Sequence, residues 1–152
     1  MEVLIVFHSQ TGNTEKLAES CAKGVSETEG VRTVLKRANL VSAEDIRRAK
    51  AIVICSPEYF GYMAGAIKDL FDRTFETLKD DPQVHKKPYA VIISAGNDGS
   101  QALLSIERII TGLKFKKVQN PVICKGRVTE EDLKKCYELG KTISEGLKLG
   151  IF

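Results

Sequence analysis

A chain of 152 residues has the length of one ordinary domain, and its 43% hydrophobic content is enough to bury a sizeable core. No apolar run approaches the roughly 20 residues that span a bilayer, so no membrane is expected as a partner and a cytoplasmic location is expected. The formal net charge of +3 is mild and the basic residues are spread along the chain, which also argues against nucleic acid as a partner.

The first third of the chain alternates between strand and helix patterns. Val3–Phe7 is a continuous apolar run, which is typical of a strand buried on both faces. Apolar residues at helical spacing between positions 17 and 25 predict a helix after it. Val31–Lys36 alternates weakly and is predicted to be a strand nearer an edge. Ser42-Ala43-Glu44-Asp45 has the form of a capping box and predicts the start of a short helix.

The rest of the chain repeats this alternation three times. The predicted elements, in chain order, are a buried strand at Ala51–Cys55, an amphipathic helix from Met63 to Leu78, a strand at Tyr89–Ser94, a helix from Leu103 to Leu113, a short strand at Pro121–Cys124 and a last helix that begins after a capping box at Thr129–Asp132. Five strands that alternate with helices require parallel pairing with crossover helices. The predicted fold is therefore a three-layer α/β/α sandwich in a single domain, residues 1–152.

The four cysteines exclude two common kinds of site. They form no C-x-x-C pair, only two histidines accompany them, and they stand at Cys21, Cys55, Cys124 and Cys136. This pattern is that of neither a zinc site nor a disulfide framework. We expect four packed free thiols, and no bound metal.

Ligands of open parallel sheets bind beyond the carboxyl ends of the strands, so the segment after the first strand is a candidate ligand-binding loop. It reads Ser9-Gln10-Thr11-Gly12-Asn13-Thr14 and leads directly into a helix. The helix N-terminus offers unpaired N–H groups, Gly12 allows a tight turn, and the hydroxyls add donors. Together these groups predict a cage for a phosphate dianion, although a plain turn with an N-cap is the alternative.

Two further loops follow the third and fourth strands. Ser56-Pro57-Glu58-Tyr59-Phe60-Gly61-Tyr62 carries three aromatic side chains, which would suit a flat apolar ligand unless they pack onto the following helix. Ser94-Ala95-Gly96-Asn97-Asp98-Gly99-Ser100 is small and polar, so its main-chain N–H groups could approach the edge of a ring system. The alternative for this second loop is an ordinary connection with Ser100 as N-cap. His8, just before the first loop, is expected to be structural.

The first loop resembles the phosphate-loop signature [ST]-x-T-G-x-T of the flavodoxin-like superfamily. This resemblance covers the whole chain and implies a five-stranded sheet of order 2-1-3-4-5 with flavin mononucleotide (FMN) bound non-covalently at the point where the winding direction reverses. The segment from Ser56 to Gly65 is similar to the S-P-x-x-F-G-x-M-x-G pattern of the NAD(P)H-dependent FMN reductase and quinone reductase branch.

The resemblance also implies which residues contact the cofactor. The phosphate contacts would be Ser9, Gln10, Thr11, Gly12, Asn13 and Thr14, and the ring contacts would be Pro57, Glu58, Tyr59, Phe60, Gly61, Tyr62, Ser94, Ala95, Gly96, Asn97 and Gly99. Glu58 would then place a carboxylate beside the ring. No catalytic side chain is expected, because the flavin itself carries the redox chemistry.

The sequence is compatible with three functions. The resemblance favours an oxidoreductase that moves electrons from NAD(P)H through FMN to a quinone, a flavin or another small acceptor. The compact length and the phosphate loop also fit an electron carrier between redox proteins, although carriers of this superfamily are strongly acidic and this chain is slightly basic. The third alternative is a binding module without flavin. Related folds also suggest a homodimer.

Overall fold

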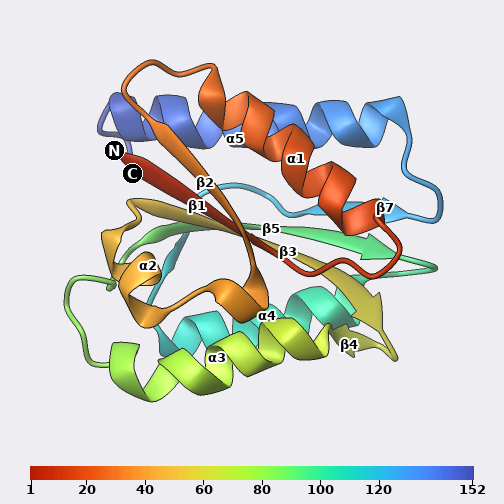
Figure 1. Cartoon of the computed structure of the whole chain (residues 1–152), viewed down its shortest axis with the longest axis horizontal. Helices are drawn as coiled ribbons and strands as arrows, with labels where there is room; N and C mark the ends of the chain where they lie inside the picture. Colours follow the sequence, from red (N-terminus) through yellow and green to blue (C-terminus); the bar gives the residue numbers. More distant parts are fainter.

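The computed structural model describes all 152 residues as one α/β/α sandwich. Four long strands make up most of the sheet, and they are β1 (Glu2–Phe7), β2 (Arg32–Arg37), β3 (Ala51–Tyr59) and β5 (Pro88–Ala95). They pair in parallel in the order β2-β1-β3-β5. In Figure 1 strands β1, β3 and β5 run from left to right, so their carboxyl ends point toward the right-hand side of the sheet.

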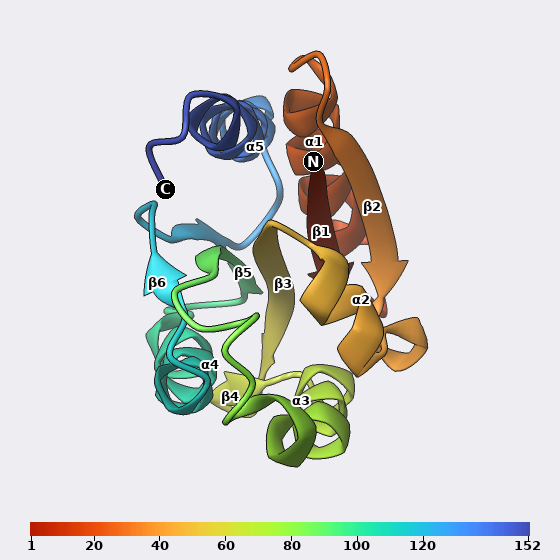
Figure 2. The same ribbon diagram turned by 90° about the vertical axis from the view of Figure 1, so that its left-hand side faces the viewer.

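Helices cover both faces of the sheet. One face carries α1 (Asn13–Ser26) and α5 (Glu130–Lys148), whereas the other carries α2 (Ala43–Arg48), α3 (Gly65–Leu78) and α4 (Ser100–Gly112). Figure 2 shows the sheet end-on between these two layers. A short 3-10 helix at Ala38–Leu40 precedes α2. No helix is both long and apolar enough to cross a membrane.

The two hydrophobic cores follow from the burial of the central strands. Every residue of β1 and β5 is buried, as the continuous apolar runs predict for strands covered on both sides. Alternate side chains of each strand point to opposite faces, so Leu4 and Val6 pack toward α3 whereas Val3 and Ile5 pack toward α1. The predicted fold class and the order 2-1-3-4-5 are confirmed.

The fifth position of the sheet differs in detail from the prediction. Two short strands share it, β6 (Lys116–Lys117) and β7 (Val122–Lys125), and both pair with β5. The polar Lys116–Lys117 pair carries no apolar signal, which is why the sequence predicts only the second of these strands.

The segment after the third strand is a hairpin, and the prediction of a loop there is wrong. Strand β3 continues to Tyr59 and pairs in antiparallel fashion with β4 (Tyr62–Met63), so α3 begins at Gly65 instead of Met63. The turn residues Phe60 and Gly61 both have positive φ, 53° and 67°, as a type I′ turn requires. This turn usually contains Asn-Gly or Asp-Gly, so Phe-Gly gave no hairpin signal.

All four cysteines are buried free thiols, as predicted. Burial raises the pKa of Cys124 to about 11 and that of Cys136 to about 12. Thiols with such pKa values stay protonated near neutral pH and are poor nucleophiles.

Candidate functional site

A polar cavity lies beyond the carboxyl ends of β1, β3 and β5. Its volume of about 330 Å³ is at the lower end of the roughly 300–1,000 Å³ typical of small-molecule sites. It is lined by Ser9, Gln10, Thr11, Asn13, Thr14, Pro57, Glu58, Tyr59, Ser94, Ala95, Gly96 and Gly126. Three loops that are far apart in the sequence therefore meet around one cavity, as the parallel topology requires.

The start of α1 leaves its first N–H groups available to a ligand. Gly12 is the N-cap residue, its φ of 100° lies in the left-handed region, and no side chain caps the helix. The Gly12 N–H itself donates to the Ser9 hydroxyl at 3.1 Å, which closes the loop on itself. By contrast, α2 and α5 are closed by capping boxes at Ser42 and Thr129. An uncapped N-terminus beside a cavity is a favourable place for an anion.

Two buried hydroxyl groups join the first loop to the end of β5. The Thr14 Oγ1 atom lies 2.6 Å from the Ser94 Oγ atom, and the two residues are 2% and 7% exposed. A hydrogen bond of this length in a buried place fixes the relative position of the two loops.

Arg37 supports the first loop from the end of β2. Its guanidinium donates to the Ser9 carbonyl at 3.4 Å and to the Glu15 carboxylate at 3.0 Å, and lies 4.9 Å from the ring centroid of Phe7. Sequence reasoning missed this residue. Because Arg37 also ends a parallel strand, the rule that points to strand ends could have found it.

The surroundings of His8 favour its neutral form. Burial and the nearby charge of Arg37 both lower its pKa. Its ring meets the Tyr59 ring edge-on, with the centroids 6.0 Å apart. His8 does not line the cavity, and its structural role stays a prediction.

The three aromatic side chains of the hairpin lie in three different places. Tyr59 lines the cavity, whereas Phe60 projects from the turn and is fully exposed. Tyr62 lies in a neighbouring hollow beside Leu104 of α4. Only one of the three aromatic side chains is thus available to a ligand in the cavity.

The Glu58 carboxylate is turned toward α4. Its Oε1 atom accepts a hydrogen bond from the Gly99 N–H at 3.2 Å, and its Oε2 atom accepts one from the Ala102 N–H at 3.0 Å. The N-cap of α4 is Gly99 instead of Ser100, and it provides no capping side chain. Glu58 therefore serves as the cap of a helix that lies more than forty residues further along the chain.

Seventeen residues are predicted from the sequence to form the site. Eleven of them line the cavity. The other six do not line it, and they are Gly12, Phe60, Gly61, Tyr62, Asn97 and Gly99. Gly126 lines the cavity and was missed. Its φ is 73° and its N–H donates to the Ala95 carbonyl at 2.7 Å, immediately after β7.

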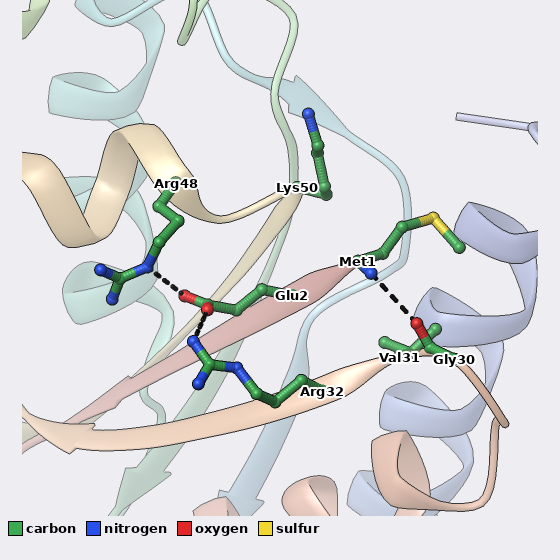
Figure 3. A pocket seen from close by; sticks show the side chains of 7 residues that line it. All are labelled: Met1, Glu2, Gly30, Val31, Arg32, Arg48 and Lys50. Atoms are coloured by element: carbon green, nitrogen blue, oxygen red, sulfur yellow. Dashed lines mark hydrogen bonds and ion pairs between the residues drawn. The ribbon is translucent and has the colours of Figure 1, made fainter.

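A second, larger hollow lies at the opposite edge of the sheet (Figure 3). Its volume is about 580 Å³, and at its centre the buried Glu2 carboxylate accepts hydrogen bonds from Arg32 and Arg48. Burial alone would raise the pKa of Glu2, but the two arginines outweigh this effect and lower it. These contacts join the start of β1 to β2 and α2, at the edge that faces away from the three loops.

The donors around the polar cavity suit one phosphate monoester attached to a flat ring. The free N–H groups of α1 and the hydroxyls of Ser9, Thr11 and Thr14 lie on one side, and no lysine or arginine lines the cavity. Tyr59 and the backbone around Gly96 lie on the other side. Neutral donors at a helix N-terminus are sufficient to bind a phosphate.

Comparisons with known proteins show the family to which the chain belongs. A flavodoxin of Aquifex aeolicus is 26% identical over 160 residues, which cover 95% of this chain and 85% of that protein. An NAD(P)H dehydrogenase (quinone) of Syntrophobacter fumaroxidans is 31% identical over 98 residues, so the chain spans only about half of that relative. The structure of an archaeal flavodoxin superposes with a TM-score of 0.82 at 24% identity, covering 97% of this chain and 99% of that one. The family model for flavodoxin matches residues 5–140. The chain therefore belongs to the flavodoxin family.

Proposed function

We propose that this protein binds FMN in the polar cavity and carries electrons between redox proteins. Membership of the flavodoxin family implies FMN binding. The observation that most supports the position of the cofactor is the uncapped N-terminus of α1, which opens onto three hydroxyl side chains. These donors would hold the phosphate, because a dianion is stabilised by the partial positive charge of a helix N-terminus.

The remaining lining residues would position the ring. Pro57 and Tyr59 offer apolar surface, and the neighbouring backbone of Ser94–Gly96 offers polar groups. When bound, FMN supplies a centre that takes up and releases electrons. Neither the four thiols nor His8 line the cavity, so its polar side chains are hydroxyls, amides and the Glu58 carboxylate.

Two observations favour the carrier function. The similarity to a flavodoxin extends over nearly the whole chain, whereas the similarity to the quinone dehydrogenase covers half of it. The exposed Phe60 side chain also stands at the tip of the hairpin beside the cavity, where it could contact a partner protein. Because the chain carries a net charge of +3, we expect the partner to present a neutral or acidic surface.

A second candidate is an oxidoreductase that reduces FMN with NAD(P)H. It is favoured by the Ser56–Gly65 motif and by another hollow, of about 430 Å³, between the hairpin turn and α4. This hollow contains Tyr62, Lys68 and Arg108, and the two cations could bind the phosphates of a nucleotide.

One anaerobic experiment separates the possibilities. We expect purified protein to acquire a bound flavin spectrum with FMN, and to be reduced by a flavodoxin reductase much faster than by NADH or NADPH. Rapid bleaching of the flavin band by either nucleotide alone would instead support the oxidoreductase. A protein that stays colourless and does not quench FMN fluorescence would support the binding module without flavin.

A further inference from the structure

We infer that Glu58 is a positioning residue that fixes the width of the slot for the flavin ring, an inference that rests on the proposed binding of FMN. Glu58 stands in β3 between Pro57 and Tyr59, which line one wall of the cavity. Its carboxylate accepts hydrogen bonds from Gly99 and Ala102, which lie just beyond the Gly96 wall. One side chain thus joins two of the segments that meet at the cavity, and a bound ring would lie against both.

Both carboxylate oxygens are used in this contact. The Gly99 N–H and the Ala102 N–H belong to the first turn of α4, and each donates to a different oxygen, at 3.2 and 3.0 Å. A carboxylate at a helix N-terminus is stabilised by the helix dipole as well as by the two hydrogen bonds. A two-point contact of this kind restrains both the distance and the angle between β3 and α4.

The hairpin has other attachments that would preserve the fold without Glu58. The Met63 N–H donates to the Ser105 hydroxyl of α4 at 3.2 Å, and the Ala64 N–H donates to the buried Ser56 hydroxyl at 3.0 Å. These bonds hold the base of the hairpin, and β3 pairs with β5 as far as Pro57 and Ser94, whereas Glu58 bonds the strand to the residues that follow β5. Loss of the carboxylate should therefore loosen the slot before it unfolds the domain.

The same contact explains why α4 differs from α1 as an anion site. Both helices begin at the carboxyl edge of the sheet with a glycine N-cap of positive φ. At α4 a carboxylate from within the chain already occupies the N-terminus, whereas the N-terminus of α1 remains free. Glu58 would thus act on the ring, and α1 would act on the phosphate.

This division of roles gives a sharp test with two flavins. Glu58→Gln keeps the size of the side chain but replaces one acceptor oxygen by a donor, so one of its two hydrogen bonds is lost. We expect it to weaken the binding of FMN and of riboflavin by the same factor, about tenfold, and Glu58→Ala to weaken both further. The visible circular dichroism of bound FMN should change as well, because it reports the surroundings of the ring.

Ser42→Ala is the matched control, because it removes a helix cap from α2, away from the cavity. It should lower stability and leave both flavin affinities and the circular dichroism unchanged. If the Glu58 variants bind both flavins like the parent protein with the same dichroism, Glu58 is only a helix cap and the inference is overturned. A loss confined to FMN would also overturn it, since that would place Glu58 at the phosphate. A parent protein that binds neither flavin would overturn the proposed function itself.

Discussion

Gly99 combines two constraints that an alanine at this position would violate together. Its φ of 77° lies in the left-handed region, where an L side chain costs about 1–2 kcal/mol. A Cβ atom would also lie 2.7 Å from the Cγ2 atom of Ile123 and 3.2 Å from the Cβ atom of Ala95. Forcing extra volume into a packed core typically costs about 1–3 kcal/mol. We therefore expect Gly99→Ala to lower the free energy of unfolding by roughly 2–5 kcal/mol.

Gly12→Ala provides the control for the conformational part of this cost. Gly12 has a φ of 100°, but a Cβ atom there would have no neighbour within 4 Å. Only the backbone penalty of about 1–2 kcal/mol should appear. Urea unfolding followed by far-ultraviolet circular dichroism measures both variants. Equal losses of stability would refute the argument that Gly99 is held by packing against Ile123.

Three further predictions concern the site, the acid stability and the docking surface. Thr14→Val should lower the free energy of unfolding by about 1–3 kcal/mol, because it leaves the buried Ser94 hydroxyl without its partner. Calorimetric titration of this variant should show a larger loss of affinity for FMN than for riboflavin. Burial alone would raise the pKa of Asp45, but hydrogen bonds from Lys36 and Ser42 lower it to about 2. The Asp45 carboxylate should contribute on the order of 2 kcal/mol to the free energy of unfolding above about pH 4, and this contribution should be lost as the pH falls through 2. Urea unfolding of Asp45→Asn should therefore depend less on pH in this acid range than that of the parent protein. Phe60→Ser should slow reduction by a protein reductase in stopped-flow experiments while hardly changing FMN affinity, and a large loss of affinity would mean that Phe60 contacts the ring.

Much of the fold could be predicted because the buried strands carry a strong signal. Val3–Phe7 and Ala51–Cys55 are continuous apolar runs, and such runs between helical patterns allow few topologies. The capping boxes at Ser42 and Thr129 marked the starts of α2 and α5 correctly. The hairpin at Phe60 could not be predicted, because its turn depends on a phenylalanine with positive φ, which is uncommon for such a residue.

The loops that form the candidate site could be predicted, because they follow the ends of strands. The directions of individual side chains in these loops could not. The loops at Ser9–Thr14 and Ser94–Gly96 meet at one cavity because parallel strands end at the same edge. The orientation of Glu58 toward α4 depends on a contact across 41 residues, and no local pattern encodes it. The same applies to the exposed Phe60 ring, whose direction is set by the turn.

The most direct test of the phosphate site is a calorimetric comparison of FMN with riboflavin, which has the same ring but no phosphate. Because each charge-assisted hydrogen bond contributes about 1.5–3 kcal/mol, we expect FMN to bind at least about a hundredfold more tightly. Thr11→Asp should place a carboxylate beside the phosphate and abolish this advantage, while riboflavin binding changes little. Equal affinities for the two flavins, or equal losses for both in the variant, would contradict binding of the phosphate at the start of α1.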